Sequence, residues 1–198
     1  MGQYYRPCIL KKDYKTSKSN PVDVTLDSWD FMDGAKLMEH SYVGNWFVSA
    51  MCDLLSQKKY FGRPFVWCGD YADEVEVNGV STSIYEMAGA DKLLKKGDLA
   101  KEYSEKFDKD GVPTFGYVVN LTKKEYCTIP KHINNKLTIH PLPILCSSGN
   151  GRGGGDFYSV IENDERIGSW AFDEIGITND IEKYKDFKKI DGAFKEDR

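Results

Sequence analysis

The sequence predicts a single α+β domain in which a mainly antiparallel sheet packs against one central buried helix. Short apolar or alternating runs recur along the 198 residues between turn-forming residues, which is typical of strands. Residues 45–58 are apolar around most of a helical circumference, which indicates a helix enclosed by the rest of the fold. Aromatic residues make up 13% of the chain, and that content suits a strand-rich core.

The composition is that of an ordinary globular protein, with 40% hydrophobic and 29% charged residues. A formal net charge of −4 argues against broad binding to nucleic acid or to an anionic membrane. No apolar run approaches the ~18 residues of a membrane-spanning helix, and the first residues lack the apolar region of a signal peptide. The five cysteines are widely spaced and form no Cys-x-x-Cys pair. We therefore expect free thiols and a cytoplasmic protein.

The first third of the chain predicts a hairpin followed by helices. Residues 3–10 predict the opening strand, and 22–26 predict the second strand of the hairpin. Residues 35–42 predict a short helix with Asp33 as its cap. The buried helix over 45–58 is expected to start from its first residue, an asparagine, which is a preferred cap.

The middle of the chain predicts a central strand and then a polar insertion. Residues 65–68 form a continuous apolar run bounded by turn signals, the pattern of a central buried strand. Residues 74–111 are polar and charged, so we expect a surface insertion, with a helical turn at 83–88 and a solvated helix at 98–107. The single domain is expected to cover 1–178, including this insertion.

The last third predicts further strands and a charged tail. Residues 114–121 and 125–129 predict paired strands across a tight turn. Residues 139–146 predict an extended run, and 175–178 predict a short strand. The charged residues 179–198 are interpreted as a C-terminal extension, with a peripheral helix and a frayed end.

One glycine-rich stretch holds a single arginine and carries most of the functional information. It comprises Gly149, Asn150, Gly151, Arg152, Gly153, Gly154, Gly155 and Asp156. Glycines allow successive backbone N–H groups to form an anion-binding concavity, and the Arg152 guanidinium adds a planar, permanent positive charge. Neither the Gly-Lys-Ser/Thr ending of a phosphate loop nor the dinucleotide fingerprint is present. The stretch predicts a binding site without identifying its ligand; a flexible loop with a solvated Arg152 is the alternative.

A second polar cluster, Asp70, Tyr71 and Asp73, directly follows the predicted central strand. A strand end is rigid while its loop is open, so this is a favourable place for a site. Asp70 and Asp73 suit acid–base work, Mg²⁺ binding or ion pairing with Arg152. We expect the glycine-rich stretch to lie beside this end of the strand.

His40 is a further candidate site residue, next to Glu39. Successive residues on a helix point about 100° apart, so only one of the two can face a given site. The spacing matches no metal motif, and we favour a helix-end histidine hydrogen-bonded to backbone over a metal ligand. No metal or cofactor is assigned. Ser147, Ser148 and Cys146 lack the sequence context of an activated nucleophile.

Four blocks of sequence carry a resemblance, at 2–5 (Gly-Gln-Tyr-Tyr), 36–45, 67–73 (Trp-Cys-Gly-Asp-Tyr-Ala-Asp) and 140–156. Their order is similar to that in a family of uncharacterised bacterial and phage proteins, over most of the chain except the charged insertion and the tail. The family has no established activity, so the resemblance implies one compact domain of a type also found in phages. Small phage proteins of this kind sometimes bind nucleotide signals of host defence, which favours a nucleotide ligand.

The leading functional hypothesis is a binding module for a small phosphate-bearing ligand, with a nucleotide as the first candidate. Loop amides and Arg152 would hold the phosphate, and Tyr71, Phe157 or Trp170 would stack on the base. In the phage setting, the module would sequester a signalling nucleotide. The sequence does not predict an oligomeric state.

Two alternatives remain open. The first is a metal-dependent phosphoester hydrolase in which Asp70, Asp73 and Asp156, with His40, position Mg²⁺ or water. The second is a protein-interaction module whose glycine-rich loop is purely structural. A binder releases its nucleotide unchanged after denaturation, whereas an enzyme releases product.

Overall fold

The computed structural model describes residues 3–89, 92–95, 99, 115–131, 138–149 and 164–194. The strands are β1 (Tyr5–Leu10), β2 (Val22–Thr25), β3 (Arg63–Gly69), β4 (Val75–Val77), β5 (Val80–Thr82), β6 (Tyr117–Asn120), β7 (Glu125–Thr128), β8 (Ser147–Ser148), β9 (Glu174–Thr178) and β10 (Lys188–Lys189). The helices are η1 (Tyr14–Thr16), η2 (Ser28–Phe31), α1 (Leu37–His40), α2 (Trp46–Ser56), α3 (Ile84–Met87), α5 (Pro141–Leu145) and η4 (Glu182–Tyr184). The predicted single domain of mixed helix and sheet is confirmed.

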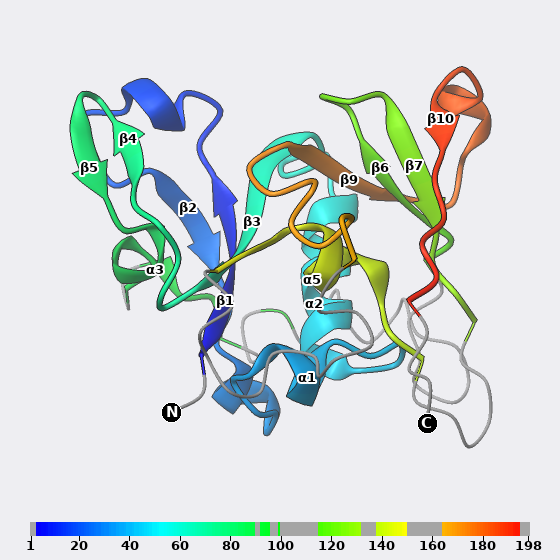
Figure 1. The fold of residues 1–198 in the computed structure, drawn as a ribbon, viewed down its shortest axis with the longest axis horizontal. Helices are drawn as coiled ribbons and strands as arrows, with labels where there is room; N and C mark the ends of the chain where they lie inside the picture. The colour runs from blue at the N-terminus through cyan, green and yellow to red at the C-terminus, as the bar shows by residue number, and fades with distance from the viewer. Residues whose placement is uncertain are drawn as a thin grey trace.

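β3 is the central strand of an eight-stranded, mostly antiparallel sheet in the order β10-β7-β6-β9-β3-β1-β2, with β8 also paired to β3. One edge of β3 pairs with β1 over Phe65 to Gly69. The other edge is shared: β9 runs antiparallel to its first residues, and β8 runs parallel to Trp67 and Cys68. β1 and β2 therefore lie on one side of β3, and β9, β6, β7 and β10 lie on the other (Figure 1).

The predicted central strand is confirmed, and both of its faces are buried. Phe65 and Trp67 belong to the core cluster that includes α2. Val66 and Cys68 point to the opposite face and join a second cluster, to which β1 and α3 contribute. This alternation explains why the run is apolar throughout, since a half-exposed strand would carry polar residues at every second position.

The predicted buried helix is also confirmed, and its start is set by Asn45. The side-chain oxygen of Asn45 accepts a hydrogen bond from the N–H of Val48 at 3.1 Å, which satisfies one donor of the first turn. All nine residues from Phe47 to Leu55 are buried. None of the helices in the described ranges has the length and apolar character to cross a bilayer.

The predicted extended run over 139–146 is wrong in its centre, because Pro141–Leu145 form α5. His140 caps this helix through Nδ1, which accepts from the N–H of Leu142 at 3.1 Å. Proline suits the first turn of a helix, since its missing N–H has no partner there and its φ is already helical. The two prolines that indicated an extended chain therefore start a helix.

Two other expected helices differ from the structure. The first is shorter than predicted, at Leu37–His40, and the Asp33 carboxylate accepts a hydrogen bond from Asn45 Nδ2 at 2.9 Å instead of capping it. The tail forms the short turn η4 and then β10, which pairs in parallel with the edge of β7. The free hydrogen-bonding groups of that edge provide partners for the tail that an exposed helix would lack.

The described start of the expected insertion forms a small sheet of its own and then a short helix that packs on the main sheet. β4 and β5 form a hairpin, and α3 follows with Ser83 as its cap, as predicted for the helical turn. Ile84 and Ala88 pack into the core cluster beneath β3. The helix expected at 98–107 lies outside the described residues, except for position 99.

Candidate functional site

The ends of β3 and β8 form one edge of the molecule, where two sequence-predicted clusters meet. The strands run in parallel, with Trp67 opposite Ser147 and Cys68 opposite Ser148. Parallel strands end at the same edge, and ligands of open sheets bind outside such carboxyl ends. Gly69 and Gly149, the next residues along the two strands, therefore lie side by side. Gly149, the first residue of the glycine-rich stretch, therefore lies beside the end of the central strand.

The side chain of Gln3 lies between these two glycines and is fully buried. A Cβ on Gly69 would lie 2.8 Å from Cδ of Gln3, and a Cβ on Gly149 would lie 2.6 Å from Nε2. Both distances are too short for any real side chain. The hydroxyl of Tyr5 donates to Oε1 of Gln3 at 3.0 Å, which orients the amide. Gln3 in this position therefore leaves no room for a Cβ on either glycine.

The other end of the Gln3 amide has no partner in the described part of the chain: Nε2 is buried and donates to no acceptor. Leaving a buried donor unsatisfied costs about 1–3 kcal/mol. Because buried donors are normally paired, this nitrogen makes the edge a candidate binding position. The sequence position of Gln3 gave no sign of this role, because the contact joins the start of the chain to residues 69 and 149.

Asp70 continues the edge and holds the start of the chain in place. Its Oδ1 accepts from the N–H of Tyr4 at 3.0 Å, and its own N–H donates to the carbonyl of Tyr4 at 2.9 Å. Tyr71 is 40% exposed, and Asp73 is also exposed. Asp70 and Tyr71 thus directly follow Gly69, which contacts Gln3. Asp73 lies two residues further along the chain and is exposed.

His40 lies in the core, and the interpretation of a hydrogen-bonded helix-end histidine is confirmed. Trp67 Nε1 donates to His40 Nε2 at 3.0 Å, so the proton resides on Nδ1, which donates to the carbonyl of Gly34 at 3.0 Å. Burial lowers the pKa of His40 to about 4. The imidazole is therefore neutral at pH 7. It packs in the core against Trp67 of the central strand instead of facing the edge where β3 and β8 end.

A second buried histidine, His140, contacts Cys52 with 3.6 Å between Nε2 and Sγ. Its Nδ1 accepts from the Leu142 N–H, so the proton of the neutral ring is on Nε2 and points at the sulfur. Burial lowers the pKa of His140 to about 3 and raises the pKa of Cys52. A protonated nitrogen cannot accept the thiol proton, so this pair is a packing contact and not an activated nucleophile.

All five cysteines are buried free thiols, as expected. Burial raises the pKa of Cys68 and of Cys127 to about 12, so neither forms a thiolate near neutral pH. Among the residues that the structure describes, no group of three histidine, cysteine or acidic side chains converges as a metal site would require.

The remaining predicted ligand residues lie outside the described part of the chain. They are Asn150, Gly151, Arg152, Gly153, Gly154, Gly155 and Asp156. Phe157 lies there too. Trp170 is fully buried and donates its indole N–H to Glu125 at 3.0 Å, so it is not available to stack on a ligand. Tyr4 and Tyr71 are both exposed at this edge, and of the three aromatic residues predicted to stack on a base, Tyr71 is the one described there with an exposed ring.

Comparison with protein-family models, curated proteins and solved structures finds no significant match to this chain.

Proposed function

We propose that this protein binds a small phosphate-bearing ligand, with a nucleotide as the first candidate, at the edge where β3 and β8 end. The observation that carries the proposal is the buried, unsatisfied Nε2 of Gln3, which points to an acceptor oxygen at this edge. Phosphate and nucleobase carbonyl groups both supply such oxygens. Gln3 is a neutral donor, so it adds specificity without adding charge.

The sequence that follows Gly149 supports the same ligand class. Arg152 comes three residues later, within a run of glycines whose amides suit an anion. The guanidinium would supply the positive charge that Gln3 lacks, and Tyr71 would supply a face for a base. In the setting that the resemblance to phage proteins implies, the module would sequester a signalling nucleotide of host defence.

A thermal-shift screen over mono-, di- and cyclic nucleotides, with and without Mg²⁺, tests the proposal. A nucleotide at about 100 times its Kd stabilises the fold by about 2.7 kcal/mol, which a melting curve resolves easily. The bound compound should be recovered unchanged after denaturation. Recovery of a hydrolysed product that depends on Mg²⁺ would instead support the phosphoester hydrolase. No stabilisation by any nucleotide would support the protein-interaction module.

A further inference from the structure

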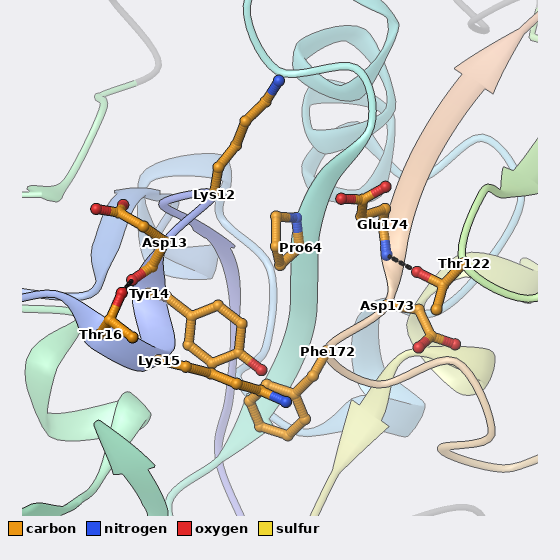
Figure 2. A pocket seen from close by; sticks show the side chains of 10 residues that line it. All are labelled: Lys12, Asp13, Tyr14, Lys15, Thr16, Pro64, Thr122, Phe172, Asp173 and Glu174. Atoms are coloured by element: carbon orange, nitrogen blue, oxygen red, sulfur yellow. Dashed lines mark hydrogen bonds between the residues drawn. The ribbon is translucent and has the colours of Figure 1, made fainter. Parts of the chain in front are cut away.

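A groove of about 580 Å³ opens between the two halves of the sheet, at the opposite end of β3 from Gln3 (Figure 2). Residues 12–16, which include η1, form one wall, and 172–174 together with Thr122 form the other. Pro64 on β3 lies between the walls. It precedes Gly69 by five residues, so about 17 Å of strand separates the groove from the Gln3 site. This volume is within the range of small-molecule sites.

The floor of the groove is aromatic and conformationally strained. The rings of Tyr14 and Phe172 stack with centroids 6.3 Å apart and an interplanar angle of 20°. Phe172 has a φ of 68°, which bulky residues rarely adopt, and its N–H is held by the carbonyl of Phe65 at 2.8 Å. Strained residues of this kind concentrate at ligand sites, because the surrounding structure maintains them for function.

The two walls carry opposite charges, as Figure 2 shows. Lys12 and Lys15 form the lysine wall, which also contains Asp13; Asp173 and Glu174 form the acidic wall. In the described ranges no ion pair involves any of these five side chains. No partner of opposite charge therefore neutralises them within these ranges. Two already have a weaker contact: the Lys15 ammonium lies 5.9 Å from the centroid of the Tyr14 ring, and Asp173 Oδ2 accepts a hydrogen bond from Asn120 Nδ2 at 2.8 Å.

We propose that this groove binds a short peptide with free termini. The peptide carboxylate lies at the lysine wall, its ammonium group lies at the acidic wall, and an apolar side chain packs on Tyr14 and Phe172. An extended tripeptide spans about 10 Å, which is about twice the ~4.8 Å spacing of neighbouring strands and so matches walls carried on either side of β3. Thr122 Oγ1 accepts from the N–H of Glu174 at 2.9 Å and keeps its own hydrogen to donate to a peptide carbonyl.

The charges favour a ligand that carries both signs. A nucleotide could pair its phosphates with the lysine wall but would leave the acidic wall unpaired, and a polyamine would do the reverse. A peptide with two free termini satisfies both walls at once. The groove is separate from the proposed nucleotide site, so each of the two proposals can fail without the other.

Calorimetric titration of the full chain with the tripeptide alanyl-phenylalanyl-alanine tests the proposal. The free tripeptide should bind, whereas its N-acetylated and its C-amidated forms should each bind about ten-fold more weakly, since each loses a charge-assisted contact. The double variant Lys12→Ala/Lys15→Ala should weaken binding of the free tripeptide to the same degree. It should not further weaken the C-amidated form, which has already lost the carboxylate.

Two controls make the result specific. Lys18→Ala removes an exposed lysine that does not line the groove, and it should leave the affinity unchanged. Glu174→Gln should weaken the free tripeptide but not its N-acetylated form. Undetectable binding of the free tripeptide, equal binding of the blocked forms, or an equal loss in Lys18→Ala would each overturn the proposal. Melting temperatures of the variants show that any loss of binding is not a loss of folding.

Discussion

Trp67 donates its indole N–H to Nε2 of His40 over 3.0 Å, and both side chains are fully buried. The rings also stack, with centroids 5.5 Å apart. The contact joins α1 to the central strand two residues before Gly69. It depends on a neutral imidazole, because a second ring proton on Nε2 would point at the indole donor.

The first prediction is that the fold loses stability as the pH falls from about 6.5 towards 4. An unfolded histidine has a pKa near 6.5, whereas burial lowers the pKa of His40 to about 4 and of His140 to about 3. In this window the unfolded chain binds protons that the folded chain excludes, so stability decreases with falling pH. Between pH 7 and pH 5 each histidine should remove roughly 2 kcal/mol. Urea unfolding at the two pH values measures the change.

The matched variant for this prediction is His40→Gln, which keeps an acceptor for Trp67 but does not titrate. It should remove about half of the pH-dependent loss. A loss of the same size in this variant would show that His40 is not responsible.

The second prediction concerns the close packing of Gln3 on Gly69. Gly69→Ala should destabilise the fold by about 1–3 kcal/mol, because the added methyl group overlaps the Gln3 side chain. The same substitution in a Gln3→Ala background should cost much less, since the space is then empty. A double-mutant cycle by urea unfolding measures this coupling. Additive costs would mean that Gln3 does not occupy the space between the glycines.

The sequence identifies those elements whose residues are uniformly apolar. Phe65–Cys68 and Phe47–Leu55 are enclosed on all sides, so their composition alone indicates burial. The helix at Pro141–Leu145 was missed because proline favours both extended chain and a first helical turn. The β4–β5 hairpin could have been predicted from its Asn78-Gly79 pair, which is typical of a two-residue turn. Both residues have the positive φ that such a turn requires.

The candidate site could be predicted only in part. Asp70 and Gly149 each end an apolar run, so the sequence indicates that both lie at the edge of a sheet. That β8 runs parallel to β3, and that Gln3 fills the space between their ends, depends on contacts across more than sixty residues of chain. No local pattern encodes such contacts. The groove between the sheet halves was missed for the same reason.

The third prediction concerns Arg152, whose role is argued from sequence alone. Arg152→Ala should weaken nucleotide binding by roughly ten- to a hundred-fold, the loss of one charge-assisted contact, and leave the melting temperature unchanged. Arg152→Lys should recover only part of this loss, because an ammonium group keeps the charge but not the planar fork. A lower melting temperature with unchanged nucleotide affinity would instead indicate a structural ion pair with a carboxylate such as Asp70 or Asp73.

The most direct test of the proposed function is to titrate the best-stabilising nucleotide into the wild-type protein and into Gln3→Leu, with urea unfolding of both unliganded proteins. Leucine has a similar volume but no polar atoms, so it removes the unsatisfied Nε2 together with the Oε1 that accepts from Tyr5. Both proteins therefore also carry Tyr5→Phe, which has no hydroxyl to leave unpaired. If Nε2 awaits a ligand oxygen, Gln3→Leu in this background should bind the nucleotide about ten-fold more weakly and unfold no more easily than Tyr5→Phe alone. A variant that is less stable but binds with unchanged affinity would contradict the account, because the partner of Gln3 would then belong to the chain itself.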